Sequence, residues 1–373
     1  MNMNGFDFRE QKIFQLRNLF ETYGYSRYKM NKFEEYDLYA GNKDFLLSDS
    51  VITFTDFGGK LMALKPDVTL SIVKNSRDDA DFLQKLYYNE NVYRAEQGGN
   101  GFREMTQVGL ECIGNVDDFC ILEILTLAAQ SLKAISSDCI LGISHIGILS
   151  DVLTSIGISN DLLDAAFTYI SQKNHHELNA FFSRCGVSER NISLMNQLLG
   201  SCGSPYVVLP DIRSLLSDVV DIQILDRLLD VLEVLRTRGL GDLFRFDFSE
   251  VDNIHYYNGI VFKGFVNGLP DSVLSGGQYD KLMRKMHRKS DAVGFAVYID
   301  RLERLEPQNR QYDVDTVLLY DDTTSLKCVM DYAAQLRECG QGVMVQRQRP
   351  ENVLCRQLIR LQSGEVEILE KNA

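Results

Sequence analysis

The sequence lacks any long run of lysine and arginine, and its charge is acidic on balance. It contains 39 Lys and Arg against 52 Asp and Glu, which gives a formal net charge of −13 over 373 residues. Proteins that hold nucleic acid mainly through their surface field usually carry a basic face. The composition therefore argues against tRNA or DNA binding over a broad surface, and leaves room only for a local basic patch.

Metal-binding and redox spacings of cysteine are also missing. The eight cysteines form no Cys-x-x-Cys pair, and none has a histidine at zinc-finger spacing. We therefore expect no metal site and no cofactor, and we expect buried, reduced thiols, as is typical of a cytosolic protein.

Long hydrophobic runs are absent as well. The first ten residues, MNMNGFDFRE, contain no apolar signal core, and no uninterrupted apolar run reaches the roughly 20 residues that span a membrane. We expect a cytoplasmic protein without a membrane segment. The length and the 45% share of apolar residues suit a large core and two or three domains.

Hydrophobic periodicity predicts both helices and strands. Residues 8–22 and 117–135 have apolar side chains at helical spacing, whereas 51–64 and 84–114 have the patterns and central glycines of hairpins. From about residue 160 to 238, Leu, Ile and Val recur at helical spacing and strand signals almost vanish. This pattern predicts a helical insertion between strand-rich parts.

Strand patterns return after the insertion. We predict that VLSGGQYDKLMRKM, from residue 273, is a glycine turn leading into a helix, and that DAVGFAVYIDRLERL, from residue 291, is a buried strand running into a helix. After Pro307 we predict a strand, helix, strand unit, followed by a final helix in NVLCRQLIRL. This places a boundary between residues 1–311 and 312–373.

The predicted hairpin at 84–114 brings charged and amide side chains together. Arg94 and Glu96 alternate along its first strand, and Arg103, Gln107 and Glu111 follow at spacings of four on its second. An arginine fork suits a carboxylate or phosphate, while Glu and Gln suit an ammonium or an imidazole N–H. A solvated hairpin with cross-strand ion pairs is the alternative interpretation.

Two other segments combine polar and apolar groups. In LKPDVT, Asp67 and Thr69 stand at a helix start, either as an ordinary N-cap or as an acid and a hydroxyl that face an amine. In EVDNIHYYNGIVF we predict a strand with Tyr257 on one face and Tyr256 on the other. One face must pack in the core, and the other suits a small polar ligand with an apolar body. Arg301, in the helix after the last buried strand, is a weak signal by itself.

Together, and in their order and spacing, four segments resemble the catalytic domain of histidyl-tRNA synthetases: YRAE…GFREMTQVGLECIG, IHYYNGIVF, LSGGQYDKL and AVGFAVYIDRL. The resemblance covers roughly residues 5 to 310. It implies an α+β fold of the class II aminoacyl-tRNA synthetase type, with an antiparallel sheet flanked by helices, a helical insertion and a short C-terminal α/β unit. It also implies a histidine pocket made of Asp67, Thr69, Arg94, Gln107, Glu111, Tyr256 and Tyr257.

The departures from that family concern its nucleotide chemistry. The family's tyrosine segment contains an arginine that holds the ATP α-phosphate, and the matching residue here is Asp252. Losing one such donor typically costs ~10²–10³ in rate, and an acid adds repulsion toward a polyphosphate. The resemblance thus implies a vestigial nucleotide site, with Arg103, Asp252 and Arg301, and no catalytic residue. Gln278 and Asn31 depart from the family as well.

The C-terminal unit, residues 312–373, looks like the opening of the family's anticodon-binding domain. It ends before enough strands for a complete sheet, which argues further against tRNA binding.

This combination is similar to the regulatory subunits of ATP phosphoribosyltransferase, a family of synthetase paralogues. The resemblance implies a non-catalytic homodimer that joins a short-form catalytic subunit in a hetero-octamer, activates it, and conveys feedback by L-histidine in the first step of histidine biosynthesis. A divergent histidyl-tRNA synthetase that forms histidyl-adenylate stays open, as does a histidine–ATP ligase with another acceptor.

Overall fold

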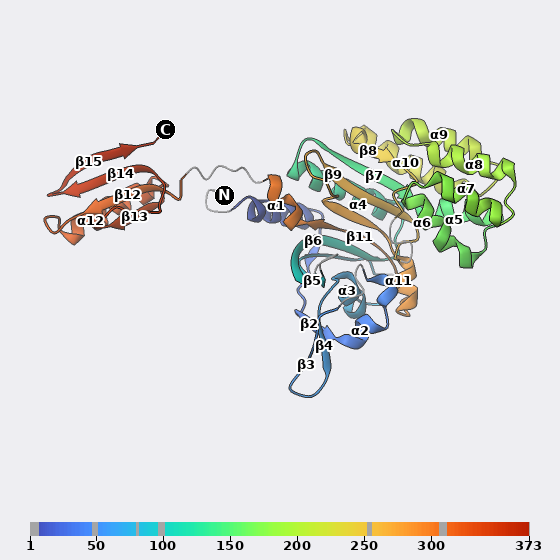
Figure 1. Ribbon diagram of the computed structural model, residues 1–373, viewed down its shortest axis with the longest axis horizontal. Coiled ribbons are helices and arrows are strands. Elements are labelled where there is room, and N and C mark those ends of the chain that lie inside the picture. Colours follow the sequence, from blue (N-terminus) through green and yellow to red (C-terminus); the bar gives the residue numbers. More distant parts are fainter. Residues whose placement is uncertain are drawn as a thin grey trace. The chain divides into compact units, whose positions relative to one another are not determined.

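The computed structural model describes residues 7–46, 51–79, 82–95, 101–251, 256–305 and 312–372. The chain divides into two compact units, Met1–Arg304 and Leu305–Ala373 (Figure 1). The division lies close to the boundary predicted after residue 311. Nowhere in these described ranges is a helix both long enough and apolar enough to cross a membrane.

An eight-stranded sheet forms the centre of the first unit, in the order β1-β5-β6-β11-β10-β9-β7-β8. The strands are β1 (Ser26–Arg27), β5 (Gln84–Ala95), β6 (Phe102–Gly114), β11 (Asp291–Tyr298), β10 (Leu274–Gln278), β9 (Ile260–Val266), β7 (Cys139–His145) and β8 (Phe244–Phe246). The six inner strands are antiparallel, as predicted. The short edge strands β1 and β8 run parallel to their neighbours, which makes the sheet mixed.

Two long helices, α1 (Phe8–Thr22) and α4 (Asp118–Ile135), pack on one face of this sheet (Figure 1). Asp117 caps α4 by accepting a hydrogen bond from the Cys120 N–H at 2.9 Å. Helix α4 approaches β9 so closely that a Cβ on Gly264 would lie 2.6 Å from the Leu132 side chain. This face is therefore filled with core side chains, and the opposite face is left for a site.

The helical insertion is confirmed. It consists of α6 (Leu163–Ser171), α7 (His175–Arg184), α8 (Glu189–Gly200), α9 (Pro205–Leu216) and α10 (Gln223–Thr237), and it follows directly on α5 (Ile146–Ser155). Figure 1 shows these helices gathered at the β7–β8 end of the sheet.

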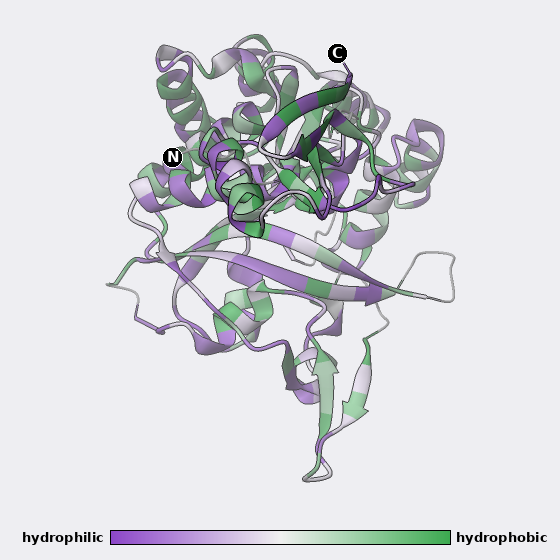
Figure 2. Ribbon diagram, turned by 90° about the vertical axis from the view of Figure 1, so that its left-hand side faces the viewer, coloured by the Kyte–Doolittle hydropathy of each residue, from purple (hydrophilic) through white to green (hydrophobic). Residues whose placement is uncertain are grey.

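A small three-stranded sheet stands at the other end of the unit, in the order β2-β4-β3. It is made of β2 (Phe33–Glu35), β3 (Thr53–Thr55) and β4 (Leu61–Leu64), so the hairpin predicted at 51–64 is confirmed. The exposed rings of Phe33 and Phe54 lie 5.3 Å apart on it, and Figure 2 shows hydrophobic residues along these strands. Just after β4, the buried Lys65 forms an ion pair with Glu90 of β5 at 2.5 Å.

Two predictions about local structure are wrong in the first unit. The segment LSGGQ is strand β10, and its helix, α11 (Asp280–Lys285), begins after it. Its glycines serve close packing: a Cβ on Gly276 would lie 2.4 Å from the Phe295 side chain, and one on Gly277 would lie 2.7 Å from the Tyr257 ring. Tyr256 and Tyr257 precede β9 in a turn, so they do not alternate along a strand.

The second unit is an α/β structure with its own small sheet, ordered β13-β12-β14-β15. It contains β12 (Val314–Tyr320), α12 (Leu326–Glu338), β13 (Val343–Gln346), β14 (Cys355–Gln362) and β15 (Glu365–Lys371). The final helix predicted in NVLCRQLIRL is wrong, because residues from Cys355 onward pair with β12 as a parallel strand. The unit therefore has a sheet of four strands, where two strands were predicted.

Candidate functional site

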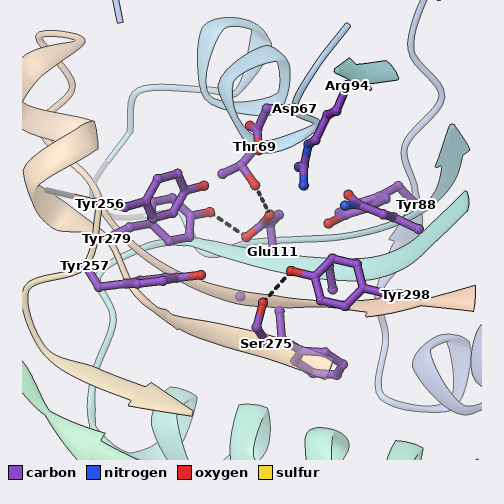
Figure 3. Close-up of a pocket in the computed structure, with 14 residues that line it drawn as sticks. Asp67, Thr69, Tyr88, Arg94, Glu111, Tyr256, Tyr257, Ser275, Tyr279 and Tyr298 are labelled. Carbon is purple, nitrogen blue, oxygen red and sulfur yellow. Dashed lines mark hydrogen bonds between the residues drawn. The ribbon is translucent and has the colours of Figure 1, made fainter. Parts of the chain in front are cut away.

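A pocket lies on the face of the central sheet opposite α4, over β6, β11 and β10 (Figure 3). All seven residues that the resemblance assigned to an amino-acid site line this one pocket: Asp67, Thr69, Arg94, Gln107, Glu111, Tyr256 and Tyr257. They come from segments up to 190 positions apart, counted from Asp67 to Tyr257, so only the folded sheet brings them together.

Small residues on three adjacent strands form the floor of the pocket. Across the sheet, Gly109 pairs with Ala296, which pairs with Ser275, and Glu111 pairs with Gly294. A Cβ on Gly109 would lie 2.5 Å from the Tyr88 ring, because that ring crosses the glycine. The small side chains of Ala296 and Ser275 and the absence of one at Gly294 leave space above the sheet for the pocket.

Glu111 is the central acid of the pocket. Its carboxylate is buried and accepts hydrogen bonds from the Thr69 hydroxyl at 2.7 Å and from the Tyr279 hydroxyl at 2.6 Å (Figure 3). Burial raises the pKa of Glu111 to about 8, and the nearby Asp67 carboxylate contributes in the same direction. With this pKa the side chain holds a proton at neutral pH, and a cationic ligand would favour its release.

Asp67 and Arg94 occupy the upper rim of the pocket in Figure 3. Asp67 accepts a hydrogen bond from the Leu70 N–H at 2.9 Å at the start of α3 (Thr69–Asn75), so it works as a helix cap and lines the pocket as well. Burial raises the pKa of Asp67, while the Leu70 N–H and the Arg94 guanidinium oppose that rise. The Arg94 Nε donates to the Pro66 carbonyl at 2.9 Å, which holds the guanidinium against this turn.

Tyrosine rings form the side walls. The rings of Tyr256 and Tyr257 lie 4.8 Å apart, and Tyr256 lies 5.6 Å from Tyr279. Burial raises the pKa of each of these phenols well above its usual value, so their hydroxyls stay neutral. The prediction that Tyr256 and Tyr257 point to opposite faces is wrong, since both line the same pocket.

Sequence reasoning missed seven residues that line the pocket, four of which carry hydroxyl groups: Tyr88, Ser275, Tyr279 and Tyr298. Tyr88 had a usable signal, because it lies on the same strand as Arg94 at an even spacing and so shares its face. Ser275 was hidden by the assignment of LSGGQ to a turn.

Two of the residues predicted for a vestigial nucleotide site, Arg103 and Arg301, lie outside the tyrosine-lined pocket. Arg103 pairs with Arg94 across the hairpin but is exposed, and it does not line the pocket. Arg301 lies in the 3₁₀ helix η4 (Ile299–Leu305), with its guanidinium 4.3 Å above the Tyr298 ring. Asp252 and His255 lie outside the described residues.

This arrangement suits a small zwitterion with a ring. Two buried acids, Glu111 and Asp67, favour an ammonium or an imidazole N–H, and the Arg94 guanidinium favours a carboxylate. The tyrosine walls suit an aromatic body with a polar edge. Among the residues described, no group of three or more His, Cys, Asp or Glu is placed to hold a metal ion.

Comparisons with known proteins agree with the sequence resemblance. A profile of histidyl-tRNA synthetases matches residues 6–302. The ATP phosphoribosyltransferase regulatory subunit of Oceanobacillus iheyensis is 26% identical over 343 residues, which cover 90% of this chain and 83% of that protein.

Two solved structures extend the comparison. The ATP phosphoribosyltransferase regulatory subunit/histidyl-tRNA synthetase from Bacillus halodurans C superposes with a TM-score of 0.76 at 25% identity, over 91% of this chain and 88% of that one. A chain of the ATP phosphoribosyl transferase (HisG:HisZ) complex from Thermotoga maritima superposes with a TM-score of 0.61 at 20% identity, over 79% of this chain and 98% of that one. At 20% identity the second likeness concerns the fold alone.

Proposed function

This chain belongs to the histidyl-tRNA synthetase family, and from that premise we propose that it serves as a regulatory subunit of ATP phosphoribosyltransferase in histidine biosynthesis. The observation that carries the proposal is the match along 90% of the chain to a relative with that name. The fold shared with a chain of the Thermotoga maritima complex supports it. The partner is a short-form catalytic subunit, and the place of action is the cytoplasm.

The tyrosine-lined pocket is the site of the effector, L-histidine. Glu111 and Asp67 receive its cationic group, and Arg94 receives its carboxylate. A ligand can change the activity of a partner only by binding one state of the assembly better than another. L-histidine therefore inhibits by stabilising an inactive state of a hetero-octamer built on homodimers of this chain.

The chain itself is not expected to form an adenylate. Asp252 stands in the tyrosine segment where the synthetases have the arginine that holds the ATP α-phosphate. Arg301, at the place of a second nucleotide-binding arginine, is engaged by its own chain, since it stacks on Tyr298 and donates to Ser272. Both features reduce the positive charge available to a polyphosphate.

Mixing the purified chain with a short-form catalytic subunit should raise the rate of phosphoribosyl transfer several-fold and produce a particle heavier than either protein. The rate is measured by formation of the phosphoribosyl-ATP product, and the mass by analytical ultracentrifugation. L-histidine should lower the stimulated rate. An unchanged rate together with separate sedimentation would end this proposal.

A divergent histidyl-tRNA synthetase is the second candidate, favoured by the pocket arginine Arg94 and by the double description of the Bacillus halodurans protein. Histidine-dependent exchange between ATP and pyrophosphate separates the two functions. We expect no exchange above a histidine-free control. Exchange within about tenfold of an authentic synthetase would favour the second candidate.

A further inference from the structure

A second cavity adjoins the tyrosine-lined pocket on the same face of the sheet. It lies over β10 and β9, and its far side is formed by Glu250, Lys263 and Arg301. Lys263 pairs with Ser275 across the two strands, so the second cavity begins one strand further along the row that floors the pocket. Three residues line both hollows: Tyr257, Ser275 and Tyr298.

Tyr298 is one of two large side chains at the border, the other being Tyr257. Tyr298 is the last residue of strand β11. Gly294 and Ala296 lie on the same face of that strand and are too small to fill the pocket. The Tyr298 and Ser275 hydroxyls lie 2.5 Å apart, and Figure 3 shows this bridge below Glu111. The ring and the bridge thus stand between the pocket and the outer cavity.

Arg301 holds the ring from the outer side. Its guanidinium lies 4.3 Å above the centre of the Tyr298 ring, in a cation–π arrangement. The same guanidinium donates to the Ser272 carbonyl, and its Nη1 lies 3.3 Å from the Ser272 hydroxyl. The ring is therefore fixed on one side by a hydroxyl bridge and on the other by an anchored arginine.

We propose that Tyr298 sets the size of the ligand. Its ring divides one hollow into an inner pocket, which takes a free amino acid, and an outer cavity, so that an amino acid extended from its carboxyl group by a bulky ring system is excluded. The inference rests on the proposed function in naming L-histidine as the inner ligand. The barrier between the two cavities consists of Tyr298, Ser275 and Arg301, and we call it the wall. Its existence does not depend on which ligand binds in the inner pocket.

Two probes test the wall by isothermal titration calorimetry on the full chain. One is L-histidine. The other is a non-hydrolysable histidyl-sulfamoyl-adenosine, in which the histidine carboxyl carries a nucleoside. For the wild type we expect the extended probe to bind at least tenfold more weakly than L-histidine. For Tyr298→Ala we expect the extended probe to bind at least tenfold more tightly than it binds the wild type.

Matched variants separate the ring from the hydroxyl. Tyr298→Phe and Ser275→Ala each remove the hydroxyl bridge and keep the ring, so both should still exclude the extended probe. Tyr298→Val keeps a residue that favours strands while it removes the ring, and it replaces Tyr298→Ala if that variant does not fold.

The outcomes also distinguish this inference from the proposed function. Equal affinity of the wild type for both probes would overturn the wall, as would a ring-free variant that still excludes the extended probe. If L-histidine fails to bind the wild type, the proposed effector is wrong. Tighter binding of the extended probe to the ring-free variant than to the wild type would still support the wall.

Discussion

Gly294→Ala should abolish L-histidine binding and lower the free energy of unfolding by about 1–3 kcal/mol. A Cβ at this position would lie 1.9 Å from the Glu111 Oε2 and 2.4 Å from the Leu110 carbonyl oxygen. The carbonyl belongs to the paired strand β6, so the added methyl group requires the two strands to shift locally and the Glu111 carboxylate to leave its place. Binding is measured by calorimetry and stability by urea unfolding.

Gly142→Ala is the matched control. Gly142 is a buried glycine in β7 of the same sheet, and a Cβ there would meet no atom closer than 3.7 Å. We expect this variant to bind L-histidine and unfold like the wild type. Binding by Gly294→Ala within twofold of the wild type would show that the Glu111 carboxylate is not needed where the structure places it.

Glu111→Gln should weaken L-histidine binding by roughly 10- to 100-fold, because it removes a charge-assisted hydrogen bond in a buried site. It should also remove a proton release. The pKa of Glu111 is about 8, and a bound ammonium favours the carboxylate, so we expect the wild type to lose a proton on binding at pH 7. Calorimetry in phosphate and in Tris measures that proton through the difference in heat.

The same substitution has a defined effect on stability against pH. The folded-state pKa of about 8 lies above the usual value of 4.5, so between these values the folded chain holds one proton more than the unfolded chain. The free energy of unfolding therefore falls as pH rises through this window, by up to about 1.4 kcal/mol per pH unit. In the glutamine variant this contribution is absent, and its stability relative to the wild type should increase with pH.

Glu104→Gln provides the control for both measurements. Glu104 lies on the same strand, β6, but is exposed and outside the pocket. It should release the same proton as the wild type on binding and show the same dependence of stability on pH. If Glu111→Gln also releases a full proton, the titrating group is another one, and Asp67 is the next to replace.

How much of this site the sequence predicts depends on the range of the interactions that form it. The hairpin at 84–114 is specified locally, by alternating side chains around a glycine loop, and this was enough to place Arg94, Gln107 and Glu111 on one surface. The long helix at 117–135 is equally local, with an N-cap and a continuous apolar face. The hypothesis that these residues form a histidine pocket came from the order of the four motifs along the chain rather than from any one motif.

The errors share one cause, since each concerns a segment whose conformation is decided by distant neighbours. The segment LSGGQ has the composition of a turn, but it forms a strand. Its two glycines leave room for Phe295 and for the Tyr257 ring, which lie directly against them. In NVLCRQLIRL, the leucines and isoleucine fit a helix as well as a strand, and the parallel pairing with β12, more than 30 residues earlier, decides for the strand. No local pattern contains that information.

The hydrogen bonds from Thr69 and Tyr279 tie the Glu111 carboxylate to the first residue of α3 and to the residue that precedes α11. The pocket therefore has a floor of paired strands, and some of its walls lie outside the strands. One of these, residues 256–259, is tied to α11: the Asn258 amide donates to Asp280 at 3.0 Å and its backbone N–H donates to the Gln278 carbonyl at 3.0 Å. A ligand that displaced the tyrosine wall would therefore also displace the partner of Asn258 at the start of α11, so a structural change at the pocket would reach this short helix through one hydrogen bond.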